Sequence, residues 1–288
     1  MNSACIVCAN KKHSPYATKS GYEVWKCAQC GTLFLYPLPK AEEAAAVYSQ
    51  DYFGGALDGH GYVNYDADKE AMRTIFIRHL IHFEKLLGKP GKILDVGAAT
   101  GFFMKIAKTR GWQVHGVEIS AYAAEQGRKD GLDIVTGTLQ NVKQTDNTFD
   151  LITMWDVIEH MPDPVSDLNR VRSLLKPGGL VAVNTPDSGS FYSKLMGSRW
   201  HLFVPPEHIW YFNRKSIATL LNNSGFEVLE IGCVGKKFTV EYVINFLYRW
   251  QGLVIWRKLS DRLKNTRIGK LYFSINLRDN MYVLAKKK

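Results

Sequence analysis

The 288-residue sequence has no window of eighteen uncharged apolar residues, which excludes a membrane-spanning helix. Its first residues lack the charged and apolar regions of a secretory signal, so we expect a cytoplasmic protein. The net charge is +10, yet lysine and arginine form only short clusters at 11–12, 236–237 and 286–288. The sequence therefore lacks the basic stripe that is typical of nucleic-acid-binding proteins, and its charge alone identifies no partner.

The G-x-G-x-x-G spacing of dinucleotide-binding turns is also missing. The turn after the apolar run 93–96 reads Asp95-x-Gly97-x-Ala99-x-Gly101 and leads into an amphipathic helical segment. Residues without bulk let the backbone bend tightly and let a ligand approach it. The next apolar run ends at Glu118, whose carboxylate can accept hydrogen bonds from both ribose hydroxyls of an adenosine. Together these features predict a nucleoside-binding half of a doubly wound sheet.

The acid before the turn favours one cofactor over another. Asp95 would repel a pyrophosphate but can hold an ammonium group, and S-adenosylmethionine carries an ammonium group and no phosphate. We therefore predict an S-adenosylmethionine site. A nicotinamide or flavin site is the alternative, and a glycine turn without a ligand is disfavoured because Glu118 lies where a ribose contact is needed.

Several motifs in sequence order extend this pattern. The chain resembles the class I S-adenosylmethionine-dependent methyltransferases, in the branch of the ubiquinone-type O-methyltransferases, over roughly residues 92–232. The segments that carry the resemblance are FDLITMWD at 149–156, VIEHMPDP at 157–164, LLKPGG at 174–179, PEHIWYF at 206–212 and SGF at 224–226.

The resemblance implies an α/β fold with a seven-stranded, doubly wound, Rossmann-like sheet whose last strand is antiparallel. It implies cofactor-binding roles for Asp95, Gly97, Ala99, Gly101, Phe102, Glu118, Ile119, Thr138, Leu139, Trp155 and Asp156. Two departures are visible. Ala98 and Ala99 replace the family's small-Gly pair, and no acid follows the third strand to contact the adenine amine.

Four of the five cysteines form two pairs, Cys5-x-x-Cys8 and Cys27-x-x-Cys30. This spacing predicts a tetrahedral zinc ribbon with a structural Zn²⁺, because four thiolates leave no open position for water. Two disulfides are the alternative, disfavoured in a reducing compartment. A ribbon joined to a methyltransferase core resembles a bacterial subfamily with enzymes that act on sugars and secondary metabolites. Ribbons also occur in some rRNA methyltransferases.

The domain organisation follows from these segments. We expect a zinc ribbon at 1–38, then a linker, lid loop and leading helix at 39–91, then an S-adenosylmethionine-binding domain at 92–288. Tyr65 in the loop either closes over the cofactor or packs against the ribbon. An insertion at 238–273 carries one amphipathic helical stripe with basic residues. It predicts packing or a homodimer interface, with peripheral membrane contact as the alternative.

Methyl transfer to an alcohol requires a base that accepts the proton. We predict His208 as this base with Glu207 as its orienting partner, and His160 as the second candidate. Many aromatic residues lie between 191 and 212, and Trp200 and His201 are the predicted substrate contacts.

The sequence thus predicts an S-adenosylmethionine-dependent methyltransferase that methylates an oxygen of a small-molecule, sugar or lipid-linked acceptor. The enzyme alternative is an RNA base methyltransferase that uses the ribbon and its positive charge to hold nucleic acid. The non-enzyme alternative is a zinc-ribbon binding module on a degenerate methyltransferase core.

Overall fold

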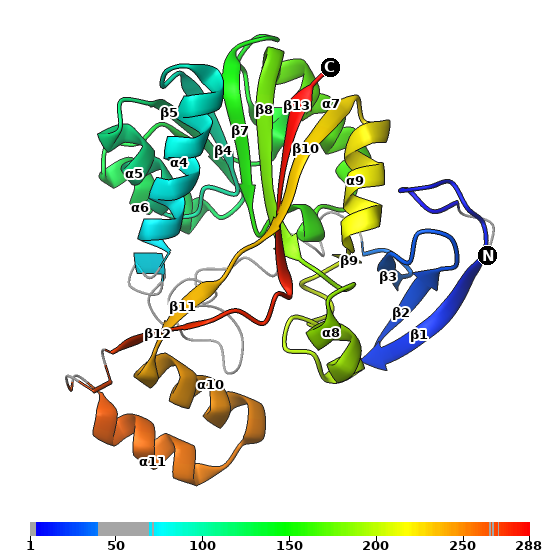
Figure 1. Cartoon of the computed structure of the whole chain (residues 1–288), viewed down its shortest axis with the longest axis vertical. Helices are drawn as coiled ribbons and strands as arrows, with labels where there is room; N and C mark the ends of the chain where they lie inside the picture. Colours follow the sequence, from blue (N-terminus) through cyan, green and yellow to red (C-terminus); the bar gives the residue numbers. More distant parts are fainter. Residues whose placement is uncertain (1–3, 40–68, 71, 265, 267, 270) are drawn as a thin grey trace.

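A parallel sheet with one reversed strand forms the centre of the molecule (Figure 1). The computed structural model describes residues 4–39, 69–70, 72–264, 266, 268–269 and 271–288. The seven strands lie in the order β10-β13-β8-β7-β4-β5-β6, and β13 is antiparallel to both of its neighbours. Their bounds are β4 Lys92–Val96, β5 Gln113–Glu118, β6 Ile134–Thr136, β7 Phe149–Trp155, β8 Leu175–Pro186, β10 Phe226–Cys233 and β13 Asn280–Lys287. The predicted fold class is confirmed.

Helices cover both faces of this sheet because successive side chains of each strand point to opposite faces. On one face, Ile93 and Leu151 pack against α4 (Arg73–Leu87) and α5 (Phe102–Thr109). On the other face, Leu94 and Ile152 pack against α7 (Pro164–Leu174) and α9 (Arg214–Asn223). The remaining helix of the core, α6 (Ala121–Lys129), packs through Ala124 with α5 and β6.

The cysteine-rich segment forms its own small sheet, and the core completes it. Strands β1 (His13–Lys19), β2 (Tyr22–Cys27) and β3 (Leu33–Tyr36) are antiparallel neighbours. The fourth strand, β9 (Trp210–Tyr211), comes from the segment between β8 and β10. Leu33 pairs with Tyr211 and Phe34 pairs with Trp210. Residues 4–39 are therefore joined to the core by a shared sheet.

The insertion before the last strand consists of two helices on a two-stranded stalk (Figure 1). The stalk is β11 (Lys236–Thr239) paired with β12 (Tyr272–Ile275), and the helices are α10 (Val240–Gln251) and α11 (Val254–Leu263). The expected single stripe is interrupted at Gly252, whose φ of +69° is left-handed. Within the described part of the chain, no helix has the length and apolar character needed to cross a bilayer.

Candidate functional site

The turn after β4 bends through three left-handed residues. Gly97, Ala99 and Gly101 have φ values of +69°, +48° and +79°. A Cβ atom on Gly97 would lie 2.5 Å from Cγ2 of Val157, and one on Gly101 would lie 2.1 Å from Cδ1 of Leu132. Glycine is therefore required at both positions by conformation and by space. Ala99 adopts the same conformation at a cost of about 1 kcal/mol.

Glu118 ties this turn to the end of β5. Its Oε2 accepts a hydrogen bond of 2.8 Å from the amide of Ala99, and its Oε1 accepts one of 2.8 Å from the amide of Ser120. Burial raises the pKa of Glu118, while these backbone donors act in the opposite direction. Each carboxylate oxygen has a second lone pair, so the group can still accept ligand hydroxyls.

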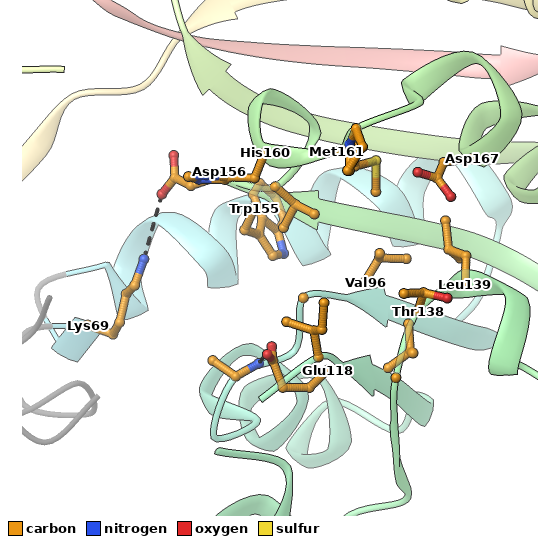
Figure 2. A pocket seen from close by; sticks show the side chains of 17 residues that line it. Lys69, Val96, Glu118, Thr138, Leu139, Trp155, Asp156, His160, Met161 and Asp167 are labelled. Carbon is orange, nitrogen blue, oxygen red and sulfur yellow. Dashed lines mark hydrogen bonds and ion pairs between the residues drawn. The ribbon is translucent and has the colours of Figure 1, made fainter. Parts of the chain in front are cut away.

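A pocket opens at the carboxyl ends of β4, β5, β6 and β7, where ligands bind in open α/β sheets. Figure 2 shows Lys69 and Asp156 at one end of it and Thr138, Leu139 and Asp167 at the other. The predicted cofactor residues that line the pocket are Gly97, Ala99, Glu118, Ile119, Thr138, Leu139, Trp155 and Asp156. The pocket is therefore long enough to involve four strand ends, with charge at both of its ends.

Three predicted cofactor residues lie behind this surface. Gly101 is the N-cap of α5, and Phe102 is 6% exposed and packs against Phe76 and the guanidinium of Arg73. Phe102 is thus a core residue, because the first turn of α5 faces α4 and not the pocket. Asp95 is 2% exposed and does not line the pocket wall.

Asp95 carries a strongly perturbed carboxyl group. Its Oδ1 accepts a hydrogen bond of 2.6 Å from the hydroxyl of Thr153. Burial raises the pKa of Asp95 to about 7, and the neighbouring Glu118 adds to this effect. The site therefore holds one carboxyl group that changes its charge near neutral pH.

Two charged residues of the pocket had no signal in the sequence. Lys69 lies one turn before α4, and its Nζ is 3.6 Å from Oδ2 of Asp156 (Figure 2). Asp167 lies in the first turn of α7, and burial together with Asp163 raises its pKa to about 6. Both follow from how the helices pack on the sheet, and no local motif marks them.

The two candidate histidines are neighbours with different access to the pocket. Their ring centroids are 4.7 Å apart. His160 lines the pocket, whereas His208 is 7% exposed and is not among the lining residues. Nδ1 of His160 lies 2.7 Å from the carbonyl oxygen of Glu207, and Nδ1 of His208 lies 2.8 Å from that of Leu202.

A carbonyl only accepts, so each ring carries its proton on Nδ1 and presents an unprotonated Nε2 when neutral. Burial lowers the pKa of His160, which keeps the ring neutral and able to accept a proton. The orienting role expected of Glu207 changes accordingly. Its backbone carbonyl orients His160, while the ring of His208 is oriented by Leu202.

The residues predicted to contact the substrate lie in different surroundings. Trp200 is 2% exposed and its indole N–H donates to Asp279 over 2.8 Å, so its side chain belongs to the interior. An aromatic ring suits a core as well as a ligand, and the side chain of Trp200 lies in the core. His201 is half-buried, with Nε2 3.7 Å from Oδ2 of Asp279. Tyr65 lies outside the described residues.

The four paired cysteines converge on one point. The Sγ atoms of Cys5 and Cys30 are 3.7 Å apart, and those of Cys8 and Cys27 are 3.6 Å apart. All four sulfurs lie within 4.8 Å of one another. Tetrahedral zinc with bonds of about 2.3 Å requires sulfurs about 3.8 Å apart, so the donor set fits this metal.

A second group of metal-ligating types consists of Glu159, His160 and His208, whose donor atoms also lie within 4.8 Å of one another. The carboxylate of Glu159 is 1% exposed and accepts a hydrogen bond of 2.8 Å from the hydroxyl of Thr185. This contact fixes Glu159 beside the histidines, with Oε1 3.9 Å from Nε2 of His160.

Comparisons with known proteins agree with this geometry. The family model described as "Methyltransferase domain" matches residues 69–231. A ubiquinone biosynthesis O-methyltransferase from Aeromonas salmonicida is 24% identical over 187 residues, which cover 56% of this chain and 77% of that protein. The corresponding enzyme from Vibrio atlanticus is 28% identical over 170 residues, which cover 54% and 69%.

Solved structures show the same fold. A SAM-dependent methyltransferase from Archaeoglobus fulgidus superposes with a TM-score of 0.52 at 16% identity, covering 77% of this chain and 99% of that one. One from Thermotoga maritima gives a TM-score of 0.50 at 22% identity, covering 78% and 94%.

Proposed function

Because the chain belongs to the class I S-adenosylmethionine-dependent methyltransferases, we propose that it methylates a hydroxyl oxygen of a small-molecule acceptor with His160 as the general base. One observation carries the choice of base: His160 lines the cofactor pocket and its Nδ1–H is held by the carbonyl of Glu207. The relatives named as O-methyltransferases support an oxygen acceptor. Sugar and lipid-linked alcohols belong to the same proposed class.

The residues of the pocket fit the methyl donor. S-adenosylmethionine supplies an electrophilic methyl group on a sulfonium. Glu118 would hold the ribose hydroxyls, Lys69 the carboxylate, and the charge of Asp95 would favour the ammonium group. Asp167 lies at the opposite end of the pocket from Lys69 and can accept a hydrogen bond from the adenine amine (Figure 2). It would take the place of the acid that is missing after the third strand.

A labelled-methyl assay tests the acceptor class and the base. Radiolabelled S-adenosylmethionine is incubated with cell extracts separated into metabolite, glycan, lipid and RNA pools, and the product is tested for an alkali-stable ether. Once an acceptor is found, we expect His160→Asn to lower kcat 100-fold or more with little change in KM. His208→Asn is the matched control, since it alters the neighbouring ring that does not line the pocket. A larger loss of kcat in His208→Asn would reverse the assignment, and label only in RNA would favour an RNA base methyltransferase.

We also propose that Cys5, Cys8, Cys27 and Cys30 hold a structural Zn²⁺. The supporting observations are the sulfur separations and the hydrogen bonds from the thiol of Cys5 and the hydroxyl of Thr32, which lower the pKa of Cys30. Elemental analysis should find one zinc per chain in the native protein and less than a tenth of that in Cys27→Ser. An equal metal content in the two proteins would contradict the assignment.

For the helical hairpin 238–273 we propose either a peripheral contact with an anionic membrane or a homodimer interface. Leu253, Val254 and Ile255 are 52%, 61% and 67% exposed, and the basic residues Arg257 and Lys258 follow them on α11. Flotation with vesicles that contain anionic lipid should retain the native chain and release Ile255→Glu. A homodimer through the same hairpin would instead appear in sedimentation as a doubled mass that Ile255→Glu abolishes.

A further inference from the structure

A second cavity lies between the ribbon and the methyltransferase core and is separate from the cofactor pocket. Its volume is about 1060 Å³, at the upper end of the range for small-molecule sites. Strands β1 and β2 contribute to its wall, together with α8 (Phe191–Met196), the start of α9 and the segment 276–278 before β13. Neither the match to the methyltransferase family nor the geometry of the cofactor pocket assigns a role to this second cavity.

Positive charge dominates its wall. Five cationic side chains line it against one acid, Asp187, which gives a net charge of +4; they are Lys26, Lys194, Arg214, Lys215 and Arg278. Arg214 forms an ion pair with Asp187, with 3.2 Å between Nε and Oδ2, and its Nη2 donates a hydrogen bond of 2.6 Å to Sγ of Cys233. Within the described part of the chain, the other four form no ion pair. A concave wall with unpaired cations focuses a positive potential and attracts anions.

Apolar side chains lie on the same wall. Phe191 is 83% exposed, while Tyr16 and Leu277 are 38% and 39% exposed. An organic group that enters the cavity could therefore bury the exposed ring of Phe191. The cavity thus offers charge for an anionic group and an apolar face for an organic group beside it.

The cavity also lies close to the reacting centre. Asn184 on β8 donates a hydrogen bond to Asp156 on the wall of the cofactor pocket, and Asp187 lines the second cavity three residues later. Three residues of extended chain span about 10 Å. The walls of the two cavities are therefore about 10 Å apart along β8.

We propose that this cavity binds the phosphate group of the methyl acceptor, with the apolar side chains packed against the organic part next to the phosphate. This proposal rests on the proposed function, because it assigns the substrate class of the same methyltransferase site. The lining Lys and Arg side chains would neutralise the phosphate, and Phe191 would cover a base, a ring or a prenyl group.

Calorimetry with inorganic pyrophosphate tests the site without knowledge of the acceptor. The full chain, loaded with zinc and S-adenosylhomocysteine, should bind pyrophosphate with an affinity that falls as salt rises. We expect the double variant Lys194→Gln/Lys215→Gln to raise the Kd at least tenfold. The matched control is Lys85→Gln/Lys89→Gln, which removes two lysines near the amino end of β4, away from both cavities. Equal Kd values in the two double variants, or no binding to the native chain, would overturn the proposal.

Two organic probes identify the source of the phosphate. Uridine diphosphate and farnesyl diphosphate are compared with pyrophosphate in the native chain and in Phe191→Ser. The probe that resembles the acceptor should bind at least tenfold more tightly than pyrophosphate and lose this advantage in Phe191→Ser. An RNA oligonucleotide that binds the native chain and is not displaced by pyrophosphate would overturn the proposal in favour of RNA. Binding of S-adenosylhomocysteine is measured in parallel, and its absence would refute the proposed function independently of the phosphate result.

Discussion

Replacement of Asp95 by Asn should stabilise the fold and weaken cofactor binding at the same time. Asp95 is 2% exposed and accepts a hydrogen bond from Thr153, and its pKa of about 7 reflects the cost of burying a charge. Asn has nearly the same shape and can accept the same hydrogen bond, but it never ionises. The substitution therefore isolates the effect of one buried charge.

The sign and size of the change in folding stability follow from the linkage between folding and protonation of Asp95. A carboxyl group whose pKa is raised in the folded state retains its proton there while the unfolded chain loses it, so stability falls as the pH rises from 3.8 to about 7. The full penalty above pH 7 is about 4 kcal/mol, and roughly half of it is already present at pH 5.5. The stability of Asp95→Asn relative to the native chain should thus increase by ~2 kcal/mol between pH 5.5 and pH 8.

Urea denaturation of both proteins at pH 5.5 and pH 8, followed by tryptophan fluorescence, measures this change. The comparison cancels the contribution of Asp167, whose pKa is also raised, whereas the measured difference includes the interaction between Asp95 and Glu118. Calorimetry with S-adenosylhomocysteine supplies the second half of the test, since this ligand retains the ammonium group. We expect Asp95→Asn to weaken binding tenfold or more at pH 8 and less at pH 5.5. A stability difference that is independent of pH would refute the buried-charge argument, and unchanged ligand affinity would refute the proposed effect of the Asp95 charge on the ammonium group.

Two further changes test the same pocket. Glu118→Gln should weaken S-adenosylhomocysteine binding 10- to 100-fold by calorimetry, because a charged acceptor for the ribose hydroxyls becomes neutral; unchanged affinity would remove Glu118 from the site. Gly101→Ala should lose about 2–4 kcal/mol of unfolding free energy, because its Cβ would lie 2.1 Å from Cδ1 of Leu132. Gly131→Ala is the control: it has the same left-handed backbone strain but open space around it, so it should lose only about 1 kcal/mol. Equal losses in urea denaturation would show that space at Gly101 is irrelevant.

The sequence predicted the sheet well because each strand is encoded locally. The apolar runs at 92–96 and 149–155 are followed by Gly97 and Asp156, and the run at 113–118 ends at Glu118, so strand ends and pocket residues could be placed together. Long-range contacts were not predictable in this way. The pairing of Leu33 with Tyr211 joins segments that no local pattern relates, and it makes β9 the fourth strand of the small sheet.

The errors in the site have a common physical origin. Trp200 and Phe102 were assigned to ligands by residue type and position, but a large apolar ring is equally stable in a core. Lys69 and Asp167 were missed because α4 and α7 bring them to the pocket only after packing on the sheet. The ranking of the two histidines also depended on tertiary structure, since only His160 reaches the pocket wall.

The shared sheet couples the proposed zinc site to His160, the proposed general base. The carbonyl of Cys30 accepts a hydrogen bond of 2.9 Å from the side chain of Asn213, which follows β9. On the other side of β9, the amide of Ile209 donates to the carbonyl of Glu159 over 2.9 Å. The indole N–H of Trp210 donates to the carbonyl of Met161 over 2.8 Å. These contacts bracket His160 in the chain, so the position of its ring depends on β9 and hence on the ribbon.

Removal of zinc with a chelator should therefore loosen the loop that holds His160 while it leaves the central sheet intact. We expect hydrogen exchange at amides 207–212 and 159–161 to accelerate at least tenfold, because β9 loses its partner β3, and exchange within β4 and β7 to stay unchanged. Asn213→Ala provides a matched variant that removes the contact with Cys30 and keeps all four thiolates. It should reproduce part of the acceleration with full zinc content. If chelation accelerates exchange only within residues 4–36, the ribbon is an independent module and the geometry around His160 does not depend on the metal.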